Sequence, residues 1–139
     1  MEFWTAAIVP LKILTNPHAM DSILVVEDEP LILELITEAL EMYGYRVRAF
    51  ESADFAWQFI QQSGYPPRLL ITDLRMPGHI DGLELAKRLR DADAEVPIVV
   101  ASGFHPAARE LHSLNVHWLI KPFEIEQLHT ICRKLAPPP

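Results

Sequence analysis

The sequence predicts an α/β domain in which a doubly wound parallel sheet of five strands is covered on both faces by helices. From Ile23 onward, five short apolar runs alternate with five segments whose apolar residues recur at helical spacing. Such regular alternation is typical of parallel sheets with right-handed crossover connections. The length of 139 residues leaves room for one domain, and no internal repeat competes with this interpretation.

The first predicted strand and helix lie on either side of an acidic turn. The run ILVV, residues 23–26, predicts a short buried strand. Pro30 suits the first turn of the helix that follows, and Gly44 suits its end. The apolar residues at helical spacing between them are Ile32, Leu35, Ile36, Ala39, Leu40 and Tyr43.

Two further strands follow in the middle of the chain. The alternating segment YRVRAF, residues 45–50, predicts the second strand, and Ser52 is expected to cap a helix that ends near Gly64. The segment RLLITD, residues 68–73, predicts the third strand. After the turn MPG, Asp81 is expected to cap the third helix, which carries an apolar face of Leu85, Ala86 and Leu89.

The last third of the chain predicts two more strands and two more helices. The apolar run over 96–102 predicts the fourth strand, and a short helix is expected over 106–113. The segment VHWLI, residues 116–120, predicts the fifth strand. A final helix over 123–135 places Ile125, Leu128, Cys132 and Leu135 on one face.

Three segments are expected along the chain: an apolar N-terminal arm over residues 1–20, the domain over 21–136 and a proline tail over 137–139. The arm lacks the basic start and the cleavage site of a signal peptide. No apolar run reaches the roughly 18 residues that a membrane-spanning helix needs. Cys132 is the single cysteine, so no internal disulfide can form, and a cytoplasmic location is expected.

The charge balance argues against nucleic acid and membrane partners. The formal net charge is -7, and an acidic protein has no general attraction for phosphate backbones or anionic lipid. Half of the residues are apolar and 22% are charged, which is ordinary for a folded globular domain. We therefore do not expect direct binding to nucleic acid or to a membrane surface.

Polar residues stand at the ends of four predicted strands. Because the carboxyl ends of parallel strands meet at one edge of a sheet, these side chains are expected to share a crevice there. They are Glu27, Asp28 and Glu29 after the first strand, Asp73 at the end of the third, Ser102 at the end of the fourth and Lys121 after the fifth.

This combination of groups suits phosphoryl chemistry. Clustered carboxylates repel one another unless they share protons or hold a cation, and a hard ion such as Mg²⁺ prefers their oxygens. With that cation and Lys121 nearby, a phosphoryl group would be attracted, and a carboxylate could accept it as a mixed anhydride. The chain has neither G-x-x-x-x-G-K-[ST] nor G-x-G-x-x-G, so a nucleotide site is not expected.

Four ordered stretches of the chain carry a resemblance to a known family. They are ILVVEDEP, LLITDLRMPGHIDG, PIVVASG and WLIKPF, and together they extend over about residues 21–136. In these stretches the chain resembles the receiver domains of two-component response regulators, in particular the single-domain chemotaxis-regulator type. The resemblance implies a flavodoxin-like sheet with strand order 2-1-3-4-5.

The resemblance also implies a role for each acid. Asp73 would accept a phosphoryl group from a phosphohistidine on a histidine kinase or a histidine phosphotransfer protein. Asp28 and Asp73 would bind Mg²⁺ directly, together with the backbone carbonyl of Arg75, and Glu27 would act through water. Glu29 is expected in the first turn of the following helix, where the helix dipole favours an acid.

Further implied roles concern the last two strands. Ser102 would contact the phosphoryl group and shift toward it, and Lys121 would pair with the phosphoryl oxygens. The bond from Lys121 to Pro122 would be cis. Trp118 would be the switch residue that changes rotamer as Ser102 moves. Gly103 has no side chain and so would leave the phosphodonor's approach open.

One departure from the family pattern affects the output surface. Only eighteen residues lie between Ser102 and Lys121, so the fourth helix is expected to be short, about two turns. The apolar arm over 1–20 is expected either to cover the face of that helix or to pair with a second copy of the chain as a homodimer.

Other functions stay open at this point. The same fold could be a phosphorylation-independent interaction module, or a receiver fragment of a larger regulator or hybrid kinase. A metal-dependent phosphohydrolase is less favoured because no second acid lies two residues after Asp73 to serve as its acid or base. The favoured hypothesis is a single-domain regulator or phosphorelay intermediate that acts on a downstream protein target and is not itself an enzyme.

Overall fold

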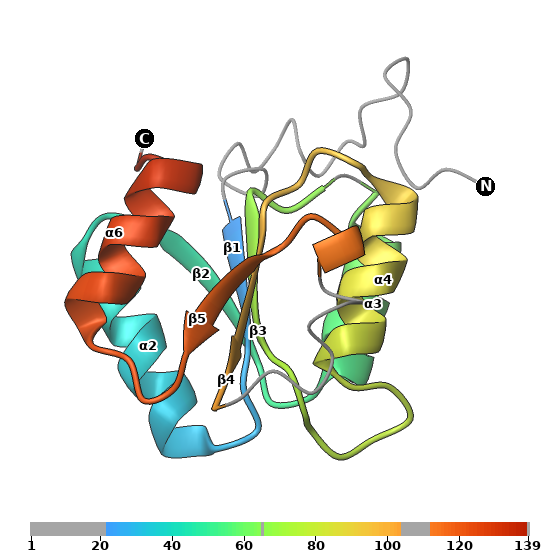
Figure 1. The fold of residues 1–139 in the computed structure, drawn as a ribbon, viewed down its shortest axis with the longest axis horizontal. Coiled ribbons are helices and arrows are strands. Elements are labelled where there is room, and N and C mark those ends of the chain that lie inside the picture. The colour runs from blue at the N-terminus through green and yellow to red at the C-terminus, as the bar shows by residue number, and fades with distance from the viewer. Residues whose placement is uncertain (1–21, 65, 104–111, 139) are drawn as a thin grey trace.

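A computed structural model of the chain describes residues 22–64, 66–103 and 112–138. Its centre is a five-stranded parallel sheet in the order β2-β1-β3-β4-β5 (Figure 1). Both the predicted fold class and the predicted strand order are therefore confirmed. The strands are β1 (Ser22–Val26), β2 (Arg46–Phe50), β3 (Leu69–Asp73), β4 (Ile98–Ser102) and β5 (His117–Ile120).

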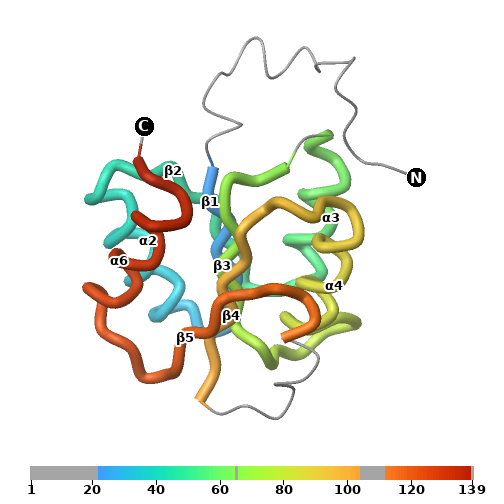
Figure 2. Tube along the Cα trace, turned by 45° about the horizontal axis from the view of Figure 1, so that its top comes forward, coloured from blue at the N-terminus to red at the C-terminus, as the bar shows by residue number. Residues whose placement is uncertain are grey.

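Helices cover both faces of the sheet. They are divided between the two faces, as Figures 1 and 2 both show. Most of the helix predicted over 106–113 lies outside the described residues, as does the arm predicted over 1–20, so both stay predictions. The described helices are α2 (Pro30–Met42) and α6 (Ile125–Leu135) on the first face, and α3 (Ala53–Ser63) and α4 (Gly82–Ala92) on the second.

The core forms two layers because successive strand residues point to opposite faces of a sheet. In β1, Ile23 and Val25 pack with α2 and α6, whereas Leu24 and Val26 pack with α3 and α4. The central strands β1, β3 and β4 are buried on both faces, as expected for a parallel sheet covered by helices on each side, whereas the edge strand β2 is largely exposed. The sheet thus presents only its two edges and its strand ends to functional groups.

The predicted helix boundaries follow from local chemistry. Ser52 Oγ accepts a hydrogen bond from the N–H of Phe55, 3.2 Å away, at the start of α3. Asp81 Oδ1 accepts one from the N–H of Glu84, 3.0 Å away, at the start of α4. Pro30 is the first residue of α2, and Gly44 follows its end with a φ of 96°, a conformation that favours glycine. The predicted caps Ser52 and Asp81 are both confirmed.

Two expectations about α2 were wrong. Its buried residues are Leu33, Ile36 and Leu40, whereas Leu35 is 56% exposed. Glu29 is the N-cap residue and not part of the first turn, and its side chain makes no capping hydrogen bond. The acidic turn therefore extends to the last residue before the helix.

No helix among the described residues is long and apolar enough to cross a membrane.

Cys132 lies fully buried on α6, and burial raises the pKa of its thiol to about 12. At about pH 8 only about 0.01% of this thiol is the reactive thiolate. We expect a disulfide reagent to leave the native protein unmodified and to label it fully once urea unfolds the chain, as read by intact mass. Rapid labelling without urea would contradict this prediction.

Candidate functional site

The site lies at the carboxyl edge of the sheet, where the chain leaves β1, β3, β4 and β5. The winding direction reverses between β1 and β3, which are neighbours in the sheet. From β1 the chain crosses to β2 on one side, and from β3 it crosses to β4 on the other. Side chains at such a reversal border an open crevice, because the two connections diverge.

Three acids meet in this crevice. Glu27, Asp28 and Asp73 each offer a carboxylate oxygen, and these oxygens all lie within 4.8 Å of one another. Glu27 is buried, while Asp28 and Asp73 are half-buried. Three hard oxygen donors at this separation fit a small divalent cation, and Mg²⁺ is commonly held by one or two carboxylates that leave room for water and phosphate oxygens.

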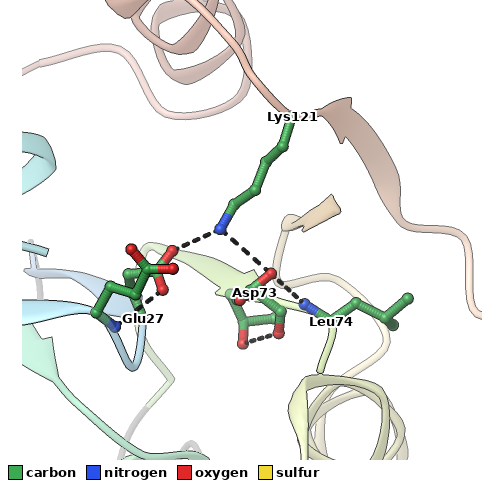
Figure 3. Close-up of polar contacts among 6 residues, drawn as sticks. Glu27, Asp73, Leu74 and Lys121 are labelled. Carbon is green, nitrogen blue, oxygen red and sulfur yellow. Dashed lines mark hydrogen bonds and ion pairs between the residues drawn. The ribbon is translucent and has the colours of Figure 1, made fainter. Parts of the chain in front are cut away.

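Lys121 stands over the acids and bridges two of them (Figure 3). Its Nζ lies 2.7 Å from Glu27 Oε1 and 3.4 Å from Asp73 Oδ1. The lysine follows β5 directly, and the peptide bond to Pro122 is cis, as the resemblance implied. One ammonium group thus offsets part of the negative charge of the cluster.

Burial decides the protonation behaviour of the two bridged acids. Removal from water raises the pKa of Glu27 above its ordinary value, despite its hydrogen bonds from Lys121 and from the N–H of Glu29. Burial likewise raises the pKa of Asp73, and the attraction of Lys121 offsets this only in part. The pKa of Lys121 is raised because its contacts with Glu27 and Asp73 outweigh the opposing effect of burial.

Replacing Asp73 with asparagine is therefore expected to raise the free energy of unfolding by about 1 kcal/mol at about pH 7 without divalent cations. The folded pKa of Asp73 lies above its unfolded value. Protonated Asp73 therefore stabilises the folded state at pH values below the unfolded pKa, and this stabilisation is lost as pH rises through the folded pKa. Asparagine has no proton to lose, so the variant does not lose stability in this way. Urea unfolding of parent and variant tests this prediction, because the difference between their free energies of unfolding should become smaller as pH falls. A difference that stays constant with pH would contradict it.

Backbone contacts fix the position of Asp73. The N–H of Leu74 donates to Asp73 Oδ1 at 3.0 Å, and Thr72 Oγ1 donates to the Asp73 carbonyl at 2.9 Å. The backbone of Gly82 approaches the same carbonyl so closely that a Cβ built there would lie 1.7 Å from its oxygen. These contacts leave Asp73 at a fixed place at the end of β3.

Ser102 on β4 and Trp118 on β5, both predicted to take part in the site, lie in different surroundings. Ser102 is buried at the end of β4, and its carbonyl accepts a hydrogen bond from the N–H of Lys121 at 2.9 Å. This bond joins the two strand ends that carry the hydroxyl and the ammonium group. Trp118 is half-buried and packs against the core on the side of α3 and α4.

Arg75 lies in the loop between β3 and α4, two residues after Asp73. Its guanidinium Nη1 lies 3.1 Å from Asp81 Oδ2, and its side chain is 58% exposed. The side chain is thus held at the start of α4, while the backbone carbonyl is the group that was predicted to face a metal ion.

Sequence reasoning missed two supporting residues. Gly82 was overlooked, although a glycine directly after a capping aspartate is a recognisable sign of close backbone approach. Asp54, in the first turn of α3, accepts a hydrogen bond from the N–H of His79 in the β3–α4 loop. Nothing in the local sequence pairs these two positions, which are 25 residues apart.

The fold and the site together define a class of protein: a doubly wound α/β domain with an acidic pocket and a lysine at the carboxyl edge of its sheet. The response regulator receiver domain family matches residues 23–133, and the chain belongs to this family. Its members act in two-component signalling as phosphoacceptors rather than as conventional enzymes, and they bind Mg²⁺ at an acidic pocket.

Several relatives illustrate the match. The response regulator receiver protein CpdR of Brucella abortus (strain 2308) is 34% identical over 112 residues, which cover 78% of this chain and 91% of that protein. The uncharacterized transcriptional regulatory protein YkoG of Bacillus subtilis (strain 168) is 31% identical over 76% of this chain. The chain spans only 46% of YkoG and between 24% and 53% of other curated regulators that it matches.

Solved structures agree with the fold. The response regulator TrrA of Thermotoga maritima, crystallised in complex with Mg²⁺-BeF, has a TM-score of 0.73 and 30% identity, covering 84% of this chain and 99% of that one. The receiver domain of the hybrid histidine kinase CckA has a TM-score of 0.70 and 29% identity, covering 83% of this chain and 98% of that one.

Proposed function

We propose that this receiver accepts a phosphoryl group on the carboxylate of Asp73 from a phosphohistidine of a histidine kinase or histidine phosphotransfer protein. The observation that carries the proposal is the place of Asp73: it ends β3, is half-buried, and lies 3.4 Å from Lys121 Nζ beside two further acids. A carboxylate in that setting can act as a nucleophile toward a phosphoryl group whose charge is matched by cations.

The transfer is a displacement at phosphorus. A carboxylate oxygen of Asp73 forms a P–O bond as the P–N bond of the donor phosphohistidine breaks, and the departing imidazole keeps the bonding electron pair and takes up a proton. The raised pKa of Asp73 means that part of the population is protonated at low pH, where it cannot attack. Transfer is therefore expected to become faster as pH rises through that pKa.

The residues that would hold Mg²⁺ are Asp28, Asp73 and the backbone carbonyl of Arg75. When bound, the ion supplies positive charge that offsets the acids and the incoming phosphoryl oxygens. Both oxygens of Glu27 are already engaged, one by Lys121 and the other by the N–H of Glu29 at 3.1 Å, which favours an indirect role through water. The similar regulator TrrA was crystallised in complex with Mg²⁺-BeF, which supports a magnesium site in this chain.

Lys121 and Ser102 are proposed to contact the phosphoryl group once it is on Asp73. Lys121 Nζ already lies 3.4 Å from Asp73 Oδ1, and the N–H of Lys121 donates to the Ser102 carbonyl. Because this hydrogen bond joins the ends of β4 and β5, a shift of one strand end displaces the other. Trp118 lies two residues before the end of β5 and is proposed as the switch residue that reports this shift to a downstream protein target.

The wider role is a cytoplasmic relay that acts through protein partners. Receiver domains of larger regulators and of a hybrid kinase are among the similar proteins, so a receiver within a longer chain is retained as a second arrangement of the same function. A homodimer through the segment 1–20 is also retained as a proposal.

Incubation with a small phosphodonor and Mg²⁺, followed by intact mass, tests the proposed acceptor. The parent is expected to gain the mass of one phosphate, and Asp73→Asn is expected to gain none because an amide oxygen is a poor nucleophile. Asp91→Asn, which neutralises an exposed acid on α4, is the matched control and should behave like the parent.

Other outcomes would identify a different function. No mass gain in the parent with any donor would contradict the proposal and favour a phosphorylation-independent interaction module. Steady turnover of a small phosphoester, with release of inorganic phosphate, would instead indicate a metal-dependent phosphohydrolase.

A further inference from the structure

The loop between β3 and α4, residues 74–81, is held by a carboxylate from a different helix. Asp54, in the first turn of α3, accepts a hydrogen bond through Oδ2 from the N–H of His79 at 3.1 Å. Its Oδ1 lies 3.8 Å from His79 Nδ1. The His79 side chain is 99% exposed, so this second contact is weak, and the backbone N–H is the main attachment.

Gly78 shows how closely the loop approaches this carboxylate. Its φ is 130°, a conformation that side chains of L-residues rarely adopt, and a Cβ built there would lie 2.3 Å from Asp54 Oδ2. The loop backbone therefore lies directly against Asp54 over two consecutive residues. A glycine is required at this position both by the backbone angle and by the contact.

The remaining attachments of the loop come from the core and from α4. Met76 and Ile80 are buried in the core between the sheet, α3 and α4. The N–H of Gly82 donates to the Leu74 carbonyl at 3.0 Å, which closes the loop at its base. Asp54 adds a polar attachment from α3 at the outer part of the loop, where Gly78 and His79 are both exposed.

We propose that Asp54 is a positioning residue that holds the β3–α4 loop so that the carbonyl of Arg75 faces the acidic cluster. This inference rests on the proposed function, in which that carbonyl is a ligand of Mg²⁺. A backbone carbonyl can serve as a ligand only when its peptide group is kept in one orientation, and groups behind a ligand commonly set metal affinity for this reason. The affinity of the site thus depends on α3, which contributes none of the proposed ligands.

Titration with Mg²⁺ alone, followed by calorimetry, tests the inference on three variants of the full chain. Asp54→Ala removes the acceptor and is expected to weaken Mg²⁺ binding by about three- to tenfold. Asp54→Asn keeps an oxygen for the same N–H and should bind within about twofold of the parent. His79→Ala removes the imidazole but keeps the backbone donor, and should also bind like the parent.

Amide hydrogen exchange provides a readout that does not depend on the metal. The His79 amide is expected to exchange faster in Asp54→Ala than in the parent and to regain protection in Asp54→Asn. Urea unfolding of each variant shows whether the domain is still folded, which separates loss of the attachment from loss of the fold.

The two proposals fail in different ways. A parent that binds no Mg²⁺ overturns the assignment of the metal site and this inference with it. A parent that binds Mg²⁺, together with an Asp54→Ala variant of equal affinity, overturns only the role of Asp54. Equal weakening in Asp54→Ala and Asp54→Asn would also overturn it, because the charge and not the hydrogen-bond acceptor would then matter.

Discussion

Gly82→Ala is expected to lower the free energy of unfolding by about 3 kcal/mol, because the added methyl group has no room. Its Cβ would lie 1.7 Å from the Asp73 carbonyl oxygen, 2.8 Å from the carbonyl carbon and 3.0 Å from Thr72 Oγ1. Two of these atoms are backbone, so β3 and α4 must move apart. Alanine at a helix start gains at most about 1 kcal/mol in helix propensity over glycine, which is too little to offset the clash.

The same substitution is expected to impair the site. Gly82 begins α4, and its N–H bonds to the Leu74 carbonyl, so a shift here displaces the loop that carries Arg75. Urea unfolding measures the stability change, and Mg²⁺ titration measures the change at the site.

Gly103→Ala is the matched control for this prediction. A Cβ at Gly103 meets no described atom within 4 Å, and Gly103 is exposed at the end of β4. The Gly103 variant should unfold at the urea concentration of the parent, although a side chain there could slow phosphodonor approach. Equal destabilisation by the two alanines would show that the contact at Gly82 is not the cause.

Lys121→Met is expected to cost about 2 kcal/mol of stability and to reduce phosphoryl acceptance on Asp73 by about one to two orders of magnitude. Methionine keeps most of the side-chain volume and removes the charge that lies 2.7 Å from Glu27. Breaking a buried ion pair costs about 3–5 kcal/mol, but this lysine is partly exposed and the acid can take up a proton, so the loss is smaller.

The pH dependence identifies the cause of that loss. Without the lysine, the pKa of the buried Glu27 should rise further, since burial alone already raises it. The stability lost in the variant should therefore be largest where Glu27 is ionised and should shrink as pH falls and the acid is protonated. Urea unfolding across pH measures this trend.

Lys134→Met serves as the control, because it removes an exposed lysine from α6 without touching the acids. It should match the parent in stability and in phosphoryl acceptance. A Lys121 variant that accepts the phosphoryl group at the parent's rate would contradict the role proposed for this residue.

The local features of the fold were predictable because their causes lie within a few residues. Ser52 and Asp81 cap their helices through bonds to an N–H three residues on, and such contacts follow from residue type and spacing. The strand runs and their order along the chain likewise follow from hydrophobic period. The apolar runs place Asp73, Ser102 and Lys121 at strand ends, and the parallel arrangement then brings these strand ends to one edge of the sheet.

Other features depend on how the elements pack. The buried face of α2 was predicted in part: Ile36 and Leu40 are buried as expected, but Leu35 is 56% exposed and Leu33 takes its place, because the contact with the sheet selects one side of the helix. The hydrogen bond from the N–H of His79 to Asp54 joins the β3–α4 loop to the first turn of α3, and no periodicity in the sequence encodes this contact.

The sequence by itself determined the fold class, the strand order through a family resemblance, and the set of acids, hydroxyl and lysine at one edge, because these follow from pattern and topology. Tertiary structure decided which of those groups meet. Lys121 contacts Glu27, which is 94 residues away in the chain, and Lys121 Nζ lies closer to Glu27 than to Asp73. Burial at this place raises the pKa of both acids. Distances and desolvation are properties of the packed chain, so they could only come from it.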